Sequence, residues 1–210
     1  MVILGLTGSI AMGKSTAAAV FRRLGVPVYD ADRAVHRLLA EGGAAVPLIE
    51  AAFPAAVAGG AVDRAKLGAI VFEDKAALAR LERIVHPLVR AGEGRFLRRQ
   101  ARRRMPLVVL DIPLLFESRG EGRCDAVAVV SAPAFVQAQR VLARPGMTLE
   151  RLAGILRRQM PDRGKRRRAD FVIESGLGKR HGLRRIARIV KVMRTRRGRH
   201  WPPRPRFARG

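Results

Sequence analysis

Short apolar runs alternate with amphipathic segments at the start of the chain. Residues 2–6 and 26–29 are apolar runs of strand length. A helical pattern of apolar residues follows each run, first over 14–24 and then after Asp30, and either Asp30 or Asp32 is a suitable N-cap for the second helix. This strand–helix order predicts a doubly wound parallel sheet.

The middle of the chain, residues 43–104, has a different character. Helical patterns dominate it, and apolar residues keep a helical period through most of the stretch. Pro87 falls inside the longest pattern and predicts a kink or a break between two helices. We therefore expect a helical insertion rather than more sheet. The predicted helices are 45–53, 65–72 and 75–104.

Strand patterns return in the second half of the chain. Basic residues, proline and glycine mark 144–168, which we expect to form a mobile lid that contains helix. Residues 194–210 have too few apolar side chains to pack against a core and are predicted to be disordered. With the two early strands, the later runs predict a five-stranded sheet. These runs are 107–112, 125–131 and 169–173, with helices over 134–143 and 183–193.

Composition narrows the class of protein. Of 210 residues, 48% are hydrophobic, which is enough for a sizeable core and excludes full disorder. The single cysteine, Cys124, excludes an intrachain disulfide framework and fits a reducing cytoplasm. No apolar run approaches the roughly 18 residues of a membrane span, and the N-terminus does not resemble a signal peptide. We expect a cytoplasmic protein that does not bind membranes.

Positive charge is high and uneven along the chain. There are 42 Lys and Arg residues against 17 Asp and Glu, a net charge of +25, and after Glu174 the chain has 13 basic residues and no acidic one. Charge of this sign favours anionic partners but does not choose among phosphate cofactors, RNA and membranes. The preference for arginine over lysine is also what a GC-rich genome produces.

The sharpest motif is GSIAMGKS at residues 8–15, which matches the phosphate-binding P-loop pattern G-x-x-x-x-G-K-[ST]. It follows an apolar strand and precedes a helix, as a P-loop requires. Backbone N–H groups of such a loop and the helix N-terminus attract phosphate. We expect Lys14 to reach the β- and γ-phosphates of ATP, Ser15 to bind Mg²⁺ and Thr16 to reach the α-phosphate. The predicted nucleotide-binding residues are Gly8, Ala11, Met12, Gly13, Lys14, Ser15 and Thr16.

The two glycines of the motif are expected to differ from its other residues. Gly8 and Gly13 permit the backbone angles that turn successive N–H groups inward. We expect a forced backbone geometry at these two positions only, so that Ser9, Ala11 and Met12 are tolerated between them.

A P-loop alone does not identify the reaction. A GTPase would need an Asn-Lys-x-Asp motif, which the chain lacks, and an ABC-type ATPase would need its own signature and a longer chain. A helical insertion and a basic lid favour a small-molecule phosphotransferase. Asp30 and Asp32 follow the second strand, where doubly wound folds place ligands, and a carboxylate there is suited to accept a hydroxyl proton or to hold a metal-bound water. The alternative is that both are helix caps.

The residues also resemble a known family, the dephospho-coenzyme A kinases. The resemblance implies transfer of the γ-phosphate of Mg·ATP to the ribose 3′-hydroxyl of dephospho-CoA, the last step of coenzyme A synthesis. It also implies an α/β P-loop fold, in which a five-stranded parallel sheet has helices on both faces. The parts of this fold are a core of about 1–32, 105–143 and 169–193, a helical CoA-binding subdomain of about 33–104, and the lid over about 144–168. The motifs that carry it are GLTGSIAMGKST (5–16), VYDADRAVHRLL (28–39), VDRAKLGAIVF (62–72), LERIVHPLV (81–89), LDIPLLFE (110–117) and ADFVIES (169–175).

The resemblance assigns roles to individual residues. Asp32 is similar to the proposed general base, and Asp30 to a supporting residue near the metal. Arg140 and Arg144 resemble arginines that contact the ATP phosphates, where a planar guanidinium binds two oxygens at once. The predicted catalytic residues are Lys14, Asp32 and Arg140. On the acceptor side the resemblance implies His86, Pro87, Pro113, Leu114, Leu115 and Glu117.

Several alternatives remain open at this stage. Asp111 ends a strand, where it is suited either to a Mg²⁺-bound water or to strand-end capping. The family commonly ends its last strand with Asp-Asn, and Glu174-Ser175 here puts a specific role at that site in doubt. Another small-molecule or nucleoside monophosphate kinase is a second hypothesis. Nucleic-acid binding through the basic tail, with Trp201 and Phe207 as stacking residues, is a third. We expect a monomer.

Overall fold

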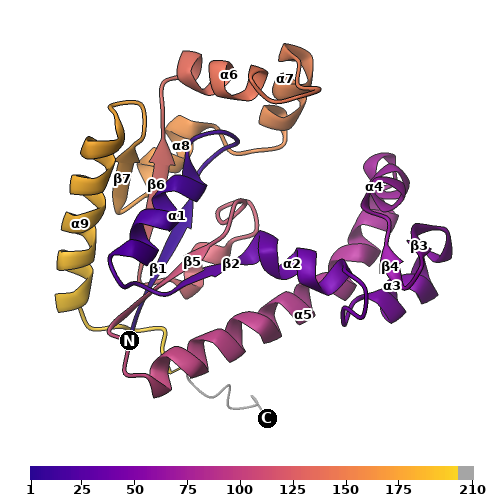
Figure 1. Cartoon of the computed structure of the whole chain (residues 1–210), viewed down its shortest axis with the longest axis horizontal. Helices are drawn as coiled ribbons and strands as arrows, with labels where there is room; N and C mark the ends of the chain where they lie inside the picture. The colour runs from indigo at the N-terminus through magenta and orange to yellow at the C-terminus, as the bar shows by residue number, and fades with distance from the viewer. Residues whose placement is uncertain (203–210) are drawn as a thin grey trace, which may run out of the picture. The chain divides into compact units, whose positions relative to one another are not determined.

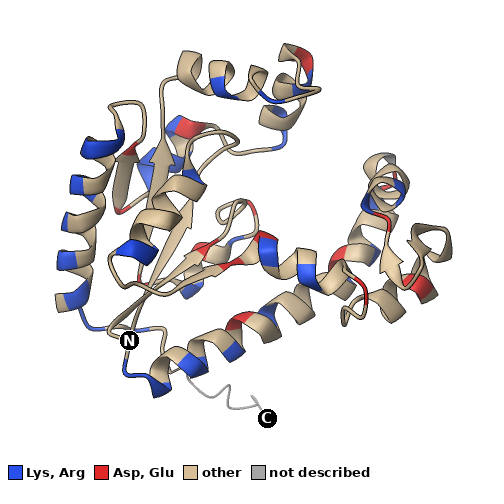
Figure 2. Cartoon of the chain, in the orientation of Figure 1, with Lys and Arg blue, Asp and Glu red and all other residues tan. Residues whose placement is uncertain are grey.

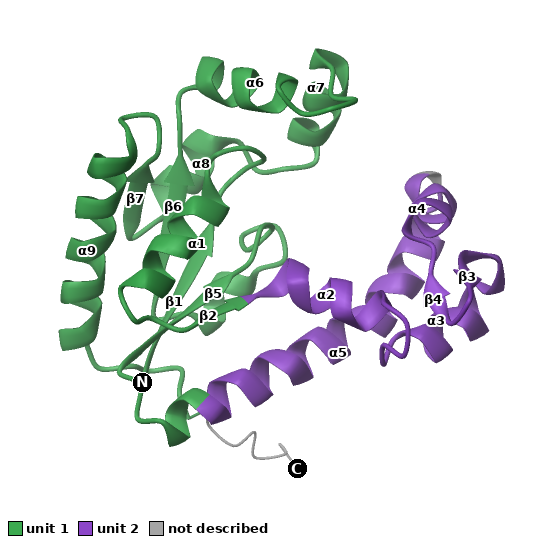
Figure 3. Ribbon diagram, in the orientation of Figure 1, with its two compact units in different colours: residues 1–29, 100–210 green, residues 30–99 purple. Residues whose placement is uncertain are grey.

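The structure of the protein is a computed structural model, and it describes residues 1–202, apart from the side chain of Glu73 (Figure 1). The chain forms two compact units. The first contains Met1–Tyr29 and Gln100–Gly210, and the second contains Asp30–Arg99 (Figure 3). None of the described helices is long and apolar enough to span a bilayer.

A five-stranded parallel sheet forms the centre of the first unit, with the strand order β2-β5-β1-β6-β7. The predicted fold class is therefore confirmed. The inner strands are apolar on both faces because helices cover them, as is usual for parallel sheets. The register pairs Leu6 with Asp111 and Ser131 with Glu174, so the carboxyl ends of the strands meet at one edge. The strands are β1 (Val2–Thr7), β2 (Val28–Asp30), β5 (Leu107–Asp111), β6 (Ala126–Ser131) and β7 (Phe171–Glu174).

Helices α1 and α9 pack against one face of this sheet. Phe21 of α1 and Ile186, Ile189 and Met193 of α9 are buried with the apolar residues of β1 and β6. The opposite side of α9 carries exposed lysines and arginines along its length (Figure 2). The helices of this unit are α1 (Lys14–Arg23), α6 (Ala134–Leu142), α7 (Leu149–Arg157), α8 (Asp162–Arg168), α9 (Lys179–Thr195) and the 3₁₀ turn η2 (Gly120–Arg123).

The second unit is mostly helical and has a hydrophobic cluster of its own. Leu39, Ile49, Phe53 and Leu67 are buried in that cluster. The unit also contains a two-stranded antiparallel hairpin, which was not predicted because each strand has only two residues. Its elements are α2 (Ala31–Leu39), α3 (Val46–Ala52), η1 (Pro54–Ala56), β3 (Val57–Ala58), β4 (Ala61–Val62), α4 (Arg64–Glu73) and α5 (Lys75–Arg102), which continues into the first unit.

Two expectations about the helices are corrected. Pro87 lies inside α5, which runs without interruption from Lys75 to Arg102. Of the predicted kink or break, the break is therefore wrong, and Ile84, Val85 and Leu88 around the proline pack against one hydrophobic cluster. Helix α9 extends to Thr195, so the predicted disordered tail begins later than residue 194.

The segment after α9 is attached to the first unit. The backbone N–H of Arg199 donates to Oδ1 of Asp125 at 2.5 Å, and the other carboxylate oxygen of Asp125 accepts from the N–H of Ile3 at 2.7 Å. Trp201 is half-buried. The prediction of disorder is therefore corrected for 194–202, whereas residues 203–210, which include Phe207, lie outside the described residues.

Candidate functional site

The P-loop connects β1 to α1 at the carboxyl edge of the sheet. Strand β1 is fully buried and ends at Thr7, and α1 begins at Lys14 with Gly13 as its N-cap. Gly13 has φ 88°, a left-handed conformation that glycine adopts without strain. The backbone therefore turns into the helix at the place where the motif requires a glycine.

The remaining loop residues correct one expectation about the backbone. Gly8 is required for a different reason from Gly13, because a Cβ at Gly8 would lie only 2.6 Å from the carbonyl oxygen of Val130. Ala11 has φ 57°, so the left-handed conformation also occurs at a residue that is not glycine. The expectation that only Gly8 and Gly13 have forced geometry is therefore wrong. The side chain of Met12 is buried, and its sulfur lies 3.1 Å from the N–H of Ala132.

The lysine of the P-loop forms an ion pair with the neighbouring strand. Lys14 Nζ lies 2.6 Å from Oδ1 of Asp111, whose side chain is almost completely buried. Asp111 is the last residue of β5, the strand next to β1, so the sheet register brings the two together. Ser15 and Thr16 are exposed in the first turn of α1. The site thus combines a fixed cation, a carboxylate and a helix N-terminus.

Arg140 contacts the P-loop from α6. Its Nη1 donates to Oγ of Ser175 at 2.9 Å and lies 3.4 Å from the carbonyl oxygen of Ala11, and its Nη2 donates to the carbonyl oxygen of Ser175 at 2.9 Å. Arg144 is exposed just after the end of α6. Of the two predicted arginines, Arg140 is held against the loop by these hydrogen bonds.

Ser175 connects three parts of the site and was missed by the sequence reasoning. Its hydroxyl donates to the carbonyl oxygen of Met12 at 2.7 Å and accepts from Arg140. Its N–H donates to the carbonyl oxygen of Ser131 at 2.9 Å. The departure from Asp-Asn at residues 174–175 had put a role here in doubt, yet the serine supplies both a donor and an acceptor at this position.

Two glutamines also support the loop without a recognisable sequence signal. Gln137 of α6 is buried and donates from Nε2 to the carbonyl oxygen of Ile10 at 2.9 Å. The N–H of Ile10 donates to Oε1 of Gln159 at 3.2 Å, from the segment between α7 and α8. Such side-chain contacts to backbone groups depend on the fold and belong to no motif.

In the stretch from Pro113 to Glu117, some side chains are exposed and others are buried in the core. The Thr7 hydroxyl donates to the carbonyl oxygen of Pro113 at 2.8 Å, which ties this stretch to the end of β1. Leu114 is exposed, whereas Leu115 is fully buried, and a Cβ on Gly5 would lie 2.8 Å from its Cδ2. Of these two leucines, only Leu114 presents its side chain at the surface.

Glu117 forms an ion pair with a buried lysine of α8. Lys165 Nζ lies 2.9 Å from Glu117 Oε1, and the Lys165 side chain is completely buried. The N–H of Met160 donates to the same carboxylate oxygen at 2.8 Å. Burial by itself would raise the pKa of Glu117, but the hydrogen bonds from Lys165 and Met160 and the charge of Lys165 outweigh burial and lower that pKa below 4.5. Glu117 thus fixes the start of α8 to the segment after β5.

The predicted residues of the second unit lie on α2 and α5. Asp30 is the N-cap of α2, where Oδ1 accepts from the N–H of Arg33 at 2.9 Å. Asp32 lies in the first turn of α2 with an exposed side chain. His86 and Pro87 are exposed on α5. Asp30 is therefore a cap, whereas Asp32 presents its carboxylate to the surface of this unit.

The sequence and the structure are similar to those of known proteins. The sequence model of the dephospho-CoA kinase family matches residues 2–178. The dephospho-CoA kinase of Paramagnetospirillum magneticum is 67% identical over 197 residues, which cover 94% of this chain and 93% of that protein. The dephospho-CoA kinase of Mesorhizobium japonicum is 58% identical over 198 residues, which cover 94% of this chain and all of that protein.

Solved structures show the same fold. The crystal structure of TT1252 from Thermus thermophilus has a TM-score of 0.80 and 40% identity, and the match covers 91% of this chain and 96% of that one. The dephospho-CoA kinase from Campylobacter jejuni has a TM-score of 0.61 at 24% identity, with 91% and 96% of the two chains covered. At this lower identity the likeness concerns the fold alone.

Proposed function

This chain belongs to the dephospho-CoA kinase family, and from that premise we propose how its residues carry out the reaction. The enzyme transfers the γ-phosphate of ATP to the ribose 3′-hydroxyl of dephospho-CoA, which gives coenzyme A and ADP in the last step of coenzyme A synthesis. The main support for placing the phosphate site at the carboxyl edge of the sheet is the ion pair between P-loop Lys14 and Asp111.

The P-loop and Arg140 form the phosphate site of this proposal. Backbone N–H groups of the loop and the N-terminus of α1 bind the β-phosphate, and Lys14, held beside Asp111, reaches the β- and γ-oxygens. Arg140 lies within reach because its guanidinium already contacts the loop at Ala11. In phosphoryl transfer the charge spreads over the γ-phosphate oxygens, so fixed cations on those oxygens lower the barrier. Arg144 joins them from the start of the lid.

Mg²⁺ fits the donor set at this edge of the sheet. The Ser15 hydroxyl is exposed at the start of α1, and the Asp111 carboxylate lies beside Lys14. In the described part of the chain, no group of three or more His, Cys, Asp and Glu side chains could hold a metal ion. That pattern suits Mg²⁺, which commonly uses one or two protein ligands with water and substrate phosphates. When bound, Mg²⁺ neutralises charge on the phosphate oxygens.

Asp32 is the proposed general base. Its carboxylate is exposed on α2, whereas that of Asp30 is occupied as the helix cap. Asp32 accepts the proton of the 3′-hydroxyl as the hydroxyl oxygen attacks the γ-phosphorus and ADP leaves. Because the transition state is loose, orientation of the hydroxyl counts more than the basicity of the carboxylate.

The acceptor and the lid complete the proposal. His86, Pro87, Pro113 and Leu114 contribute the acceptor surface, and Glu117 positions the nearby chain through Lys165. Residues 144–168 close over the bound substrates and exclude water, which limits hydrolysis of ATP. We further propose that the enzyme acts as a monomer in the cytoplasm.

A direct assay tests the proposed function. Purified protein is incubated with Mg·ATP and dephospho-CoA, and ADP release and coenzyme A formation are measured in parallel with a panel of nucleoside monophosphates. We expect equal amounts of ADP and coenzyme A, with dephospho-CoA strongly preferred. Faster phosphorylation of a nucleoside monophosphate would contradict the proposal.

A further inference from the structure

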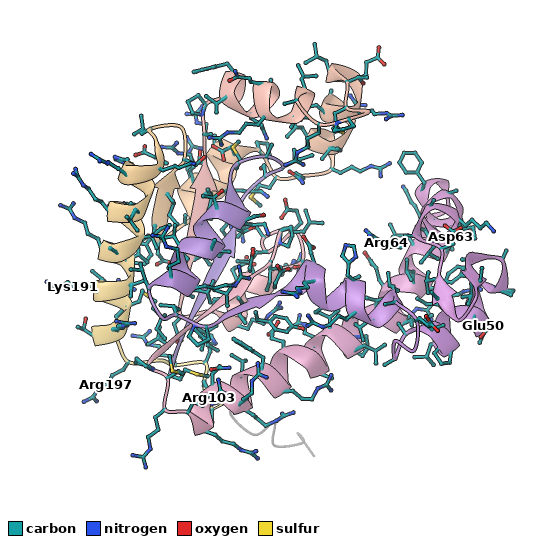
Figure 4. The ribbon with its side chains drawn as sticks, viewed as in Figure 1. Glu50, Asp63, Arg64, Arg103, Lys191 and Arg197 are labelled. Atoms are coloured by element: carbon teal, nitrogen blue, oxygen red, sulfur yellow. The ribbon has the colours of Figure 1, made fainter. Side chains whose placement is uncertain are left out.

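Arg64 and His36 contact each other on the surface of the second unit. Nη1 of Arg64 lies 3.1 Å from Nδ1 and 3.0 Å from Nε2 of His36, so the guanidinium is held close to the imidazole ring. Both residues are exposed. Arg64 begins α4 and His36 lies in α2, and Figure 4 shows Asp63 and Arg64 together at the start of α4.

The pair lies on the same face of α2 as Asp32. Asp32 and His36 are four residues apart in one helix, so their side chains project from the same face. The rise between them is about 6 Å, close to one helical turn. Arg64 therefore contacts a side chain that lies one turn along α2 from the proposed base.

No carboxylate among the described side chains forms an ion pair with Arg64. Asp63 precedes it, but Oδ1 of Asp63 accepts from the N–H groups of Ala65 and Lys66 as the cap of α4, and Oδ2 lies 4.0 Å from Lys66 Nζ. The acids that pair with a cation in the described part of the chain pair with residues other than Arg64. A cation in the first turn of a helix is also disfavoured by the helix dipole. Arg64 is thus an exposed cation without an ion-pair partner among the described acids, at a helix end whose dipole is also positive. Such a cation is well suited to bind an anionic ligand.

We infer that Arg64, with His36 beside it, binds the 5′-diphosphate of dephospho-CoA and so selects a diphosphate-bearing acceptor. This inference rests on the proposed role of Asp32. The 3′-hydroxyl and the 5′-phosphate belong to one ribose, so a hydroxyl at Asp32 places the phosphate about one helical turn away. The planar guanidinium suits two phosphate oxygens, and the imidazole holds it in place.

A purely structural role for the contact predicts different behaviour. Exposed charged pairs contribute little to stability, so a link between α2 and α4 through these two side chains would affect the melting temperature slightly and all acceptors equally. A diphosphate site instead distinguishes acceptors that carry the diphosphate from acceptors that lack it. The ratio of two affinities therefore separates the two roles.

The test measures binding of dephospho-CoA and of adenosine by calorimetry, with the nucleotide site saturated by a non-hydrolysable ATP analogue. The variants are Arg64→Gln, Arg64→Lys and the control Arg37→Gln. Arg37 is also exposed on α2, but it lies about 140° around the helix from Asp32. For Arg64→Gln we expect the Kd of dephospho-CoA to rise about 10- to 100-fold, with Arg64→Lys in between. The preference for dephospho-CoA over adenosine falls by the same factor.

Two results would overturn the inference. One is an equal loss of affinity for both acceptors in Arg64→Gln, and the other is an unchanged Kd for dephospho-CoA. Melting curves show whether the variant folds, and if Arg64→Gln does not, Arg64→Lys and His36→Gln decide the same question. The measurement is repeated with Asp32→Asn. If Asp32→Asn keeps its turnover, the proposed base is wrong, whereas the diphosphate site is judged by the Kd values alone.

Discussion

Lys14 of the P-loop and Asp111 at the end of β5 form an ion pair, with 2.6 Å between Nζ and Oδ1. The two residues are 97 positions apart in the sequence, and the parallel register of β1 and β5 brings them together. The carboxylate holds the ammonium group at the edge of the sheet where the phosphate site is proposed. Asp111 thereby controls where the lysine charge lies.

We predict that Asp111→Asn lowers kcat/KM for ATP by about tenfold or more. The amide keeps the size of the side chain but removes the charge that orients Lys14, and one charge-assisted hydrogen bond corresponds to roughly 1.5–3 kcal/mol. Steady-state kinetics at several Mg²⁺ concentrations measure the change. An increase in the Mg²⁺ concentration needed for half-maximal rate would assign Asp111 to the metal as well. Wild-type kinetics in the variant would remove Asp111 from the site.

Asp32→Asn should reduce kcat by about 100- to 10,000-fold, the usual contribution of general acid–base catalysis. Binding of ATP should stay within about twofold, because this residue acts on the acceptor. Stopped assays for kcat and calorimetry for ATP measure the two effects. Glu41→Gln is the matched control, since Glu41 is an exposed carboxylate just beyond the end of α2. A near-normal kcat in Asp32→Asn would rule out its role as the base.

Replacing Ser175 tests the support of the P-loop. Ser175→Ala loses the hydrogen bonds to the Met12 carbonyl and from Arg140, so we expect a loss of about 1–2 kcal/mol in unfolding free energy and a higher KM for ATP. Ser175→Asn, with both a donor and an acceptor in its amide, should keep most of the wild-type affinity. Denaturant titration and ATP kinetics provide the measurements. Equal behaviour of the alanine and asparagine variants would show that these hydrogen bonds do not matter.

Glu117 makes the stability depend on pH. Its pKa is lower in the folded state than the ordinary 4.5, so the carboxylate contributes stability above that value and the contribution is lost as the pH falls through the folded pKa. Glu117→Gln leaves Lys165 buried without a counter-charge and should cost about 3 kcal/mol at neutral pH. The variant should also lose less stability than wild type between neutral pH and acid.

Denaturant titrations across that pH range measure the effect of Glu117. The control is Glu121→Gln, which removes a partly exposed ion pair to Arg168 and should change the unfolding free energy by less than about 1 kcal/mol. If Glu117→Gln and Glu121→Gln lose the same small amount of stability, the ion pair with Lys165 is not a main support of α8.

The sequence predicted secondary structure correctly where a single run or period of apolar residues is enough to form the element. The apolar runs at residues 2–6 and 107–112 became β1 and β5 because a buried parallel strand needs a continuous apolar run. Pro87 did not end α5, because a proline removes one hydrogen bond of a helix whereas Ile84, Val85 and Leu88 beside it pack against a hydrophobic cluster. The positive φ of Ala11 was missed because residues other than glycine rarely adopt it.

By itself, the sequence determined the fold class, the P-loop and the family, because these depend on residues that are close together along the chain. Gly13, Lys14 and Ser15 show their chemistry in one short motif. Only the tertiary structure decided which side chains support that motif. Met12 and Ser175 are 163 positions apart and meet because β1 and β7 both flank β6 and end at the same edge of the sheet. Such contacts follow from strand order and helix packing, and no local pattern records them.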